Sequence, residues 1–152
     1  MKILTDFHTH TSASGHHTTD TLTAMAEEAS KRQLLYLGIT DHAPKMPGAA
    51  SESYFRNLKY CDKRLYGVNM LYGAELNVLS AKGTVDLPTD ILKELDYAIA
   101  SLHEKTIKPG SESANTAALV AAAENPFINI IGHPDDPTFP INAETLTDAA
   151  KA

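Results

Sequence analysis

The hydrophobic positions of this chain form strand-length runs that alternate with segments of helical period. Strands are predicted at residues 3–8, 35–40, 70–76, 97–102 and 127–131. Helices are predicted at residues 21–32, 51–66, 89–94, 115–124 and 143–151. This alternation is typical of βα units and of a parallel sheet. The pattern therefore predicts an α/β fold of about five βα units, in a single domain over residues 1–152.

Local signals indicate where several elements begin and end. Asp20 is predicted to cap the first helix, and Gly67 is predicted to end the second. The apolar face of the first helix consists of Leu22, Met25, Ala26 and Ala29, and that of the second of Tyr54, Phe55, Leu58, Leu65 and Tyr66. Residues 78–85 predict a small β-hairpin that turns at Lys82-Gly83.

The number of predicted strands limits how the sheet can close. A closed barrel of parallel strands usually has about seven or eight. Five strands cannot close in that way, so either the sheet stays open or something else completes it. An open parallel sheet leaves strand edges unpaired and apolar faces uncovered, which promotes association. We therefore expect a dimer or a larger species.

Composition and charge exclude several classes of partner. A formal net charge of -6, with 13 basic residues, disfavours a broad nucleic-acid or anionic-membrane surface, since both rely on clustered Lys and Arg. The lone Cys61 provides no disulfide framework, which fits a reducing cytosol. No apolar run resembles a signal peptide or a membrane span. We expect a cytoplasmic protein that binds neither nucleic acid nor membrane.

Histidines gather just after the predicted strands. They occur in the segments Asp6-Phe7-His8-Thr9-His10, Thr40-Asp41-His42, Ser101-Leu102-His103 and Gly132-His133-Pro134. His8 and His10 are two residues apart, so in an extended backbone both rings can reach one ion. Glu75 ends the middle strand and could bridge two metals. Each residue alone would more often be structural, but five strands that deliver ligand types to one rim predict a polynuclear metal centre.

Two choices within this set depend on the loops. His16 or His17 could fold back over the rim, and we favour His16. Asp41 could cap a helix or orient a histidine, and we favour the second role. Imidazole and carboxylate ligands without a thiolate suit Zn²⁺, Mn²⁺ or Fe²⁺. Such ions, close together at a barrel rim, support hydrolysis.

As an ordered set, these motifs resemble the PHP (polymerase and histidinol phosphatase) family, and most closely its small stand-alone phosphatases of the YcdX-like branch. The residues that carry the resemblance are Asp6-Phe7-His8-Thr9-His10-Thr11, Ile39-Thr40-Asp41-His42, Gly73-Ala74-Glu75, Leu102-His103-Glu104 and Gly132-His133-Pro134. The resemblance implies a distorted (β/α)7 barrel of the TIM-barrel kind. It also implies two to three divalent metals at the C-terminal rim and hydrolysis of phosphate esters.

The resemblance also implies a role for each ligand. By position, His8, His10 and Glu75 would hold a first metal; Glu75, His103 and His133 a second; and His16 and His42 a third. Glu75 and His103 would be the catalytic residues. A metal-bridging hydroxide would attack the phosphorus of a small phosphorylated substrate.

The sequence departs from the family pattern near its C-terminal end. Family members carry a late Asp-x-His, whose Asp binds the first metal and whose His binds the third, but no histidine follows His133. Asp135 or Asp136 could replace that Asp, although solvated turn residues are the favoured interpretation. The chain is therefore expected to be a phosphatase lacking the C-terminal part of the family fold. The alternative is a weakly active or inactive metal-binding fragment that needs a partner chain to complete the barrel.

Two other functions are less favoured. An amidohydrolase of the TIM-barrel type shares the His-x-His pair but normally needs a late Asp, and often a metal-bridging lysine, at a strand end. A nuclease is disfavoured by the acidic charge of the chain.

Overall fold

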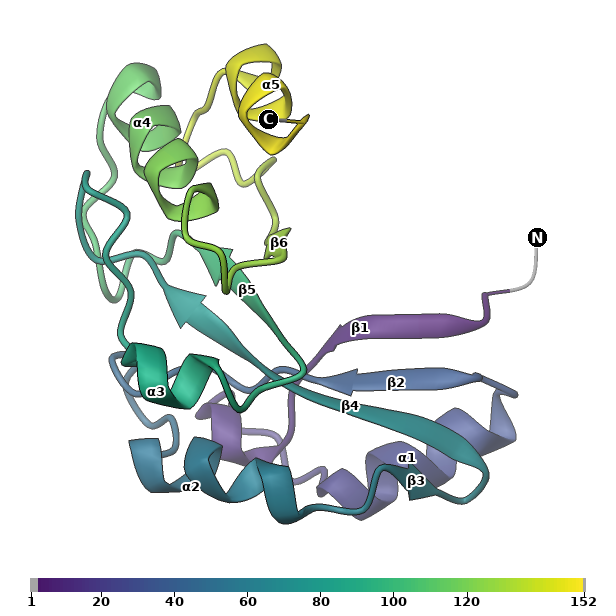
Figure 1. Cartoon of the computed structure of the whole chain (residues 1–152). Coiled ribbons are helices and arrows are strands. Elements are labelled where there is room, and N and C mark those ends of the chain that lie inside the picture. The colour runs from purple at the N-terminus through teal and green to yellow at the C-terminus, as the bar shows by residue number, and fades with distance from the viewer. Residues whose placement is uncertain (1–2, 152) are drawn as a thin grey trace.

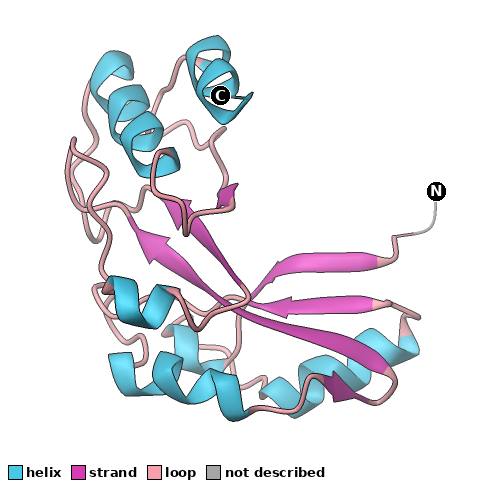
Figure 2. Ribbon diagram, in the orientation of Figure 1, coloured by secondary structure: helices cyan, strands magenta, loops and turns pink. Residues whose placement is uncertain are grey.

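The computed structural model describes residues 3–151 and contains an open, mostly parallel sheet with helices along its outer face (Figure 1). The strands are β1 (Thr5–Thr9), β2 (Tyr36–Ile39), β3 (Arg64–Leu65), β4 (Val68–Asn77), β5 (Tyr97–Ser101) and β6 (Ile130–Ile131). The helices are α1 (Leu22–Lys31), α2 (Glu52–Asn57), α3 (Thr89–Leu92), α4 (Glu112–Ala123) and α5 (Ala143–Lys151), with 3₁₀ turns η1 (Ser12–Ser14) and η2 (Leu58–Tyr60). The strand order is β1-β2-β4-β5-β6, with β3 beside β4. The predicted α/β fold with an incomplete barrel is confirmed, because the sheet curves into a half-barrel (Figure 2).

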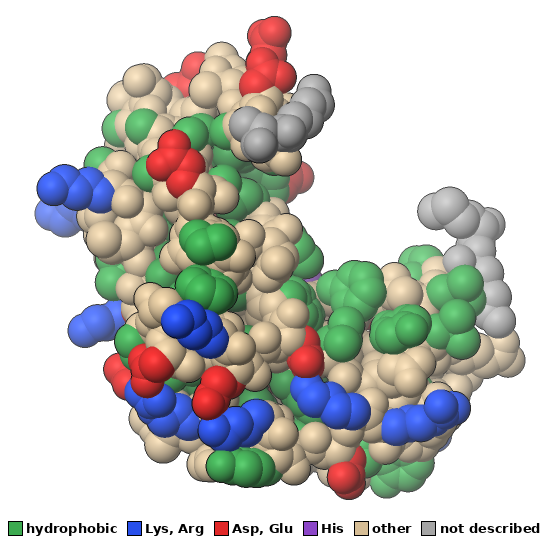
Figure 3. All heavy atoms as spheres, viewed as in Figure 1, with side chains coloured by type: hydrophobic (Ala, Val, Ile, Leu, Met, Phe, Trp, Pro, Cys, Tyr) green, Lys and Arg blue, Asp and Glu red, His purple; other side chains and the backbone are tan. Residues whose placement is uncertain are grey.

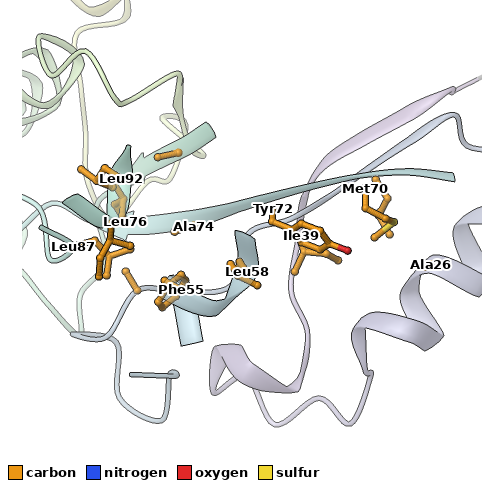
Figure 4. Packing of buried hydrophobic residues seen from close by; sticks show 14 of the residues in the cluster. Ala26, Ile39, Phe55, Leu58, Met70, Tyr72, Ala74, Leu76, Leu87 and Leu92 are labelled. Atoms are coloured by element: carbon orange, nitrogen blue, oxygen red, sulfur yellow. The ribbon is translucent and has the colours of Figure 1, made fainter. Parts of the chain in front are cut away.

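The core lies between the outer face of the sheet and the helices. Leu37 pairs with Met70 and Ile39 with Tyr72 across β2 and β4, and all four side chains are buried. They pack with residues of α1 and α2 in one hydrophobic cluster (Figure 4). A second cluster joins β5 to α4 and α5. Burial of this outer face holds the strands in register, because a slip by one residue would turn its apolar side chains inward.

The inner face of the half-barrel carries the polar residues of β4. Glu75 and Asn77 alternate along the strand with Ala74 and Leu76, which belong to the outer core. In the parallel pairing with β5, Asn77 is opposite Ser101. Because successive side chains of a strand point to opposite faces, the Glu75 carboxylate is held on the inner side at the C-terminal end of the strands.

The helix predicted over residues 51–66 is too long. It ends at Asn57, continues as η2, and is followed by the short antiparallel strand β3. Tyr66 and Gly67 both have positive φ, of 49° and 84°, and form the tight turn between β3 and β4. Leu65, counted as part of a helical stripe, pairs with Val68 instead. The prediction was wrong because an apolar residue in a hairpin can coincide with a helical period.

Other boundaries also differ from the prediction. The N-cap of α1 is Thr21, whose Oγ1 accepts a hydrogen bond from Ala24 N at 3.2 Å, rather than Asp20. The predicted hairpin over 78–85 is reduced to one bridge between Val78 and Val85, around a turn that ends at Gly83. The helix predicted over 115–124 begins at Glu112, and the strand predicted over 127–131 is limited to Ile130–Ile131. The predicted apolar face of α1 is confirmed.

Within residues 3–151, β1 and β6 are the edge strands at the two ends of the order β1-β2-β4-β5-β6. Hydrophobic side chains gather along the β1 side of the open angle (Figure 3). The exposed large residues beside this edge are Ile3, Leu4, Phe7, Leu35 and Tyr36. Ile130 is exposed at the other edge, next to an apolar groove of about 430 Å³ between β6 and α5. Most of β1 is exposed, because within residues 3–151 it has a neighbouring strand on one side alone.

None of the helices over residues 3–151 is long and apolar enough to cross a membrane.

Self-association through these edges stays a prediction, with a second copy of this chain as the partner. Light scattering of the purified protein should give a mass of at least two chains, because pairing would cover apolar side chains and strand edges. The double variant Leu4→Lys/Tyr36→Lys should shift the mass toward one chain. Tyr60→Lys is the matched control, since Tyr60 is 76% exposed on η2, outside the sheet. A monomer at every concentration would contradict this prediction.

Candidate metal centre

The Glu75 carboxylate is the centre of the histidine cluster and is 1% exposed. Six side-chain nitrogen or oxygen atoms lie within 3.3 Å of its two oxygens. Around Oε1 they are Ser101 Oγ at 2.7 Å, His133 Nε2 at 3.0 Å and His103 Nε2 at 3.2 Å. Around Oε2 they are His42 Nδ1 at 2.9 Å, His8 Nε2 at 3.2 Å and His10 Nε2 at 3.3 Å.

These five histidines come from the C-terminal ends of four strands or from the loops just after them. His8 lies in β1 and His10 directly follows it, and the other three follow β2, β5 and β6. His42 forms an isolated parallel bridge with Glu75, which extends the β2–β4 pairing to the rim. Segments far apart in the sequence therefore meet because parallel strands end at one edge of the sheet.

The donor set fits divalent cations better than it fits a network of hydrogen bonds. An ionised carboxylate offers about four lone-pair positions, fewer than the six atoms around Glu75. His42 Nδ1 has no hydrogen-bond partner, although it is buried and lies 2.9 Å from Glu75 Oε2. A buried nitrogen without a partner is costly. A cation between the rings and the carboxylate would bind both the Glu75 oxygens and the unpartnered His42 nitrogen. A set of imidazole and carboxylate ligands suits Zn²⁺, Mn²⁺ or Fe²⁺.

The charge states of the site also suit metal ligands. Burial raises the pKa of Glu75, but contacts with the histidine rings, led by His103 and His133, outweigh it and hold the pKa far below its usual range. Burial lowers the pKa of His10 to about 4, an effect partly opposed by the Glu75 charge. Glu75 is therefore ionised and His10 neutral at pH 7, which are the forms that bind metal.

The ligand atoms of the cluster form three groups, in each of which all atoms lie within 4.8 Å of one another. The groups are His8 with His10 and Glu75; His42 with Glu75 and His103; and His10 with His16 and His42. The first group has the composition expected from the resemblance. The second contains His42 where His133 was expected, and the third adds His10. The assignment of ligands to individual ions stays a prediction.

His16 lies in the cluster and His17 does not. The His16 ring centroid is 4.4 Å from that of His42 and 4.9 Å from that of His10. Burial lowers the pKa of His16, which favours the neutral ring. His17 is exposed and has a positive φ of 59°. The loop after β1 thus brings the favoured histidine over the rim.

Asp41 acts on the cluster through Ser14. It is fully buried and accepts hydrogen bonds from Thr11, from Ser14 Oγ at 2.7 Å and from the Tyr54 hydroxyl at 2.5 Å. Because Ser14 donates its single hydrogen to Asp41, it accepts from His10 Nδ1, which lies 2.8 Å away. His10 Nδ1 therefore carries the proton, and the lone pair of Nε2 faces Glu75. No helix begins at Asp41, so its N-cap alternative is excluded.

Two residues that the sequence did not single out shape the His133 side of the site. Ser101 Oγ donates to Glu75 Oε1. A Cβ on Gly132 would lie 2.2 Å from Ser101 Oγ, so a side chain there would displace Ser101. His133 has a positive φ of 26° and precedes Pro134, a combination that costs about 1–3 kcal/mol. The sequence did not indicate these roles, because Ser101 and Gly132 are far apart in the chain and neither is a usual metal ligand.

The remaining candidates lie outside the cluster. Asp135 is exposed and Asp136 is half-buried, and Asp136 Oδ1 accepts a hydrogen bond from Thr138 N at 2.8 Å, which is typical of a turn. Cys61 is partly buried against the main core. None of these three residues belongs to a ligand group within the described chain.

Comparisons with known proteins find one family and many relatives. The PHP domain family matches residues 6–151. A probable phosphatase of Clostridium novyi (strain NT) is 51% identical over 151 residues, which are 99% of this chain and 62% of that relative. A probable phosphatase of Thermoanaerobacter sp. (strain X514) is 47% identical over 152 residues, with the same coverage of both chains. The chain thus spans 62% of the length of these curated relatives.

Replacing the central carboxylate should remove bound metal. After saturation with Zn²⁺ or Mn²⁺ and removal of free ion, elemental analysis should find two or three ions per chain. Glu75→Gln should hold at least one ion fewer, because a neutral amide cannot bridge two cations as a carboxylate does. Glu124→Gln is the control, as Glu124 is an exposed carboxylate at the end of α4. Equal metal content in the wild type and Glu75→Gln would show that Glu75 is not a ligand.

Proposed function

Because this chain belongs to the PHP domain family, as its histidine motifs predicted, we propose that it is a metal-dependent phosphoesterase acting on phosphate monoesters. The observation that carries the proposal is the ring of five histidine nitrogens around the buried Glu75 carboxylate. The ligands we propose are His8, His10, His16, His42, Glu75, His103 and His133. Two to three ions of Zn²⁺, Mn²⁺ or Fe²⁺ fit this set.

Exposure of the rings indicates where substrate approaches. The side chains of His8 and His133 are 34% and 37% exposed, whereas that of His42 is 3% exposed. The rings of His8 and His133 are stacked with centroids 6.2 Å apart, and both border the open inner side of the half-barrel. A small phosphorylated substrate would approach the cluster from the side on which these two rings are exposed.

Each group of residues has a part in the reaction. Metal ions at such a site supply a nucleophile derived from water and neutralise charge that develops on the phosphoryl oxygens. Glu75 would contribute the negative charge that holds the cations. His103 and His133 hold the Oε1 side, and His8, His10 and His42 hold the Oε2 side. The protein therefore contributes mainly position and charge.

A second candidate function is a metal-binding unit that becomes active only when another chain covers its open side. The exposed edges at β1 and β6, within the described residues, favour it. The two proposals differ in how specific activity depends on protein concentration. Specific activity should be constant if one chain forms the complete unit. It should rise with protein concentration if association of chains completes the unit.

Activity on a chromogenic phosphate monoester tests both proposals. With Mn²⁺ or Zn²⁺, the protein should turn the monoester over faster than the corresponding diester. Glu75→Ala should lower kcat/KM by roughly 100-fold or more, since loss of several kcal/mol of transition-state stabilisation costs about tenfold per 1.4 kcal/mol. The measurement is repeated over a wide range of protein concentrations.

The control for this assay is Glu124→Gln, which should keep the wild-type rate. Turnover that is no higher than that of Glu75→Ala, at every protein concentration and with each metal, would refute the phosphoesterase. Turnover that appears only at high concentration would support the second candidate.

A further inference from the structure

His103 has hydrogen-bonding neighbours at both ring nitrogens. Its Nδ1 lies 2.8 Å from Asn77 Oδ1, and its Nε2 lies 3.2 Å from Glu75 Oε1. A neutral imidazole carries its proton on one nitrogen and a lone pair on the other. Only the form with the proton on Nδ1 offers Nε2 to a cation beside Glu75. The group that holds the proton on Nδ1 therefore decides whether His103 can bind a metal through Nε2.

The orientation of the Asn77 amide is fixed by acceptors on its nitrogen side. Asn77 is fully buried, and its Nδ2 donates to Ala43 O at 3.2 Å and to Asp86 Oδ2 at 2.6 Å. A carbonyl and a carboxylate can only accept, so the NH₂ group must face them. The amide oxygen is then left to face His103 Nδ1, which must donate to it.

Asp86 holds the backbone as well as the side chain of Asn77. Its Oδ1 accepts from Asn77 N at 2.9 Å, and its Oδ2 also accepts from Lys45 N at 2.9 Å. Lys45 belongs to the loop that follows His42, and Asp86 follows the Val78–Val85 bridge. Asp86 thus joins the loops after β2 and β4 to the strand end that carries Asn77.

We propose that Asn77, oriented by Asp86, is a positioning residue that fixes His103 with its proton on Nδ1 and so directs the Nε2 lone pair to the metal site. The inference rests on the proposed metal-dependent function, because it assigns residues that prepare a ligand of that site. It is independent of the arrangement of Asp41, Ser14 and His10, which involves other side chains. Neither Asn77 nor Asp86 contacts Glu75 through a hydrogen bond.

The direct test is the protonation of the His103 ring in the metal-free protein. Nitrogen-15 NMR distinguishes the two neutral ring forms, and a His103→Gln variant identifies the signal. At about pH 8.5, the neutral His103 ring should carry its proton on Nδ1. A ring protonated mainly on Nε2 in the wild type would overturn the proposal without any variant.

Asn77→Leu removes the acceptor while keeping a side chain of similar size. The His103 ring should then populate both neutral forms, and Zn²⁺ affinity should fall by about 10- to 100-fold, as is typical when a partner of a metal-binding histidine is lost. The matched control is Asn69→Leu on the same strand, whose Nδ2 donates to Leu35 O at 3.0 Å, away from the site. It should change neither measurement.

Asp86→Ser serves as a second variant in case Asn77→Leu does not fold. It frees the Asn77 amide to rotate and should also mix the two ring forms and weaken Zn²⁺ binding. Unchanged ring protonation and affinity in the folded variants would overturn the proposal. A failure of the proposed phosphoesterase function would look different. The protein would then show no turnover of the phosphate monoester, while the His103 ring form and the Zn²⁺ affinity would still change in the variants as expected.

Discussion

Burial of one ionised carboxylate is the constraint on which the rest of this structure depends. An ionised group out of water is tolerated only where partners surround it. Glu75 is 1% exposed, and its partners come from the ends of the parallel strands and from the loops that follow them. The parallel order of the strands is thus what makes the buried charge possible, because it brings all these segments to a single rim.

The partners of Glu75 are themselves held by a layer of short polar side chains. Ser14 and Asp41 act on His10, and Asn77 and Asp86 act on His103. These side chains come from the same strand ends or from loops that fold back across them. A small displacement of any loop would therefore change both the position of a ring and the nitrogen that carries its proton. The apolar outer face of the sheet, packed against the helices, provides the rigid support for this arrangement.

The two faces of the sheet have different roles. The outer face is closed by helices and accounts for the buried core, whereas the inner face has few covering residues within the described chain. This openness exposes His8 and His133 to solvent and also leaves Phe7 and Tyr36 uncovered. Access to the site and a tendency to associate thus have the same structural origin. A segment that covers the inner face would change both properties together.

The sequence alone determined the α/β class, the five parallel strands and the ligand-type residues at their ends, because these follow from local period and from residue chemistry. It did not determine β3, since Leu65 fits a helical stripe as well as a hairpin. It also assigned no role to Ser101, which stands in the segment that ends at His103, or to Asn77 and Asp86, which are common residues without a motif. Tertiary structure alone decided that these side chains meet the histidines, and that His42 lies among two groups of ligand atoms. The physical reason is that a local pattern specifies which face of a strand a residue occupies, whereas hydrogen bonds between loops depend on how distant strand ends are brought together.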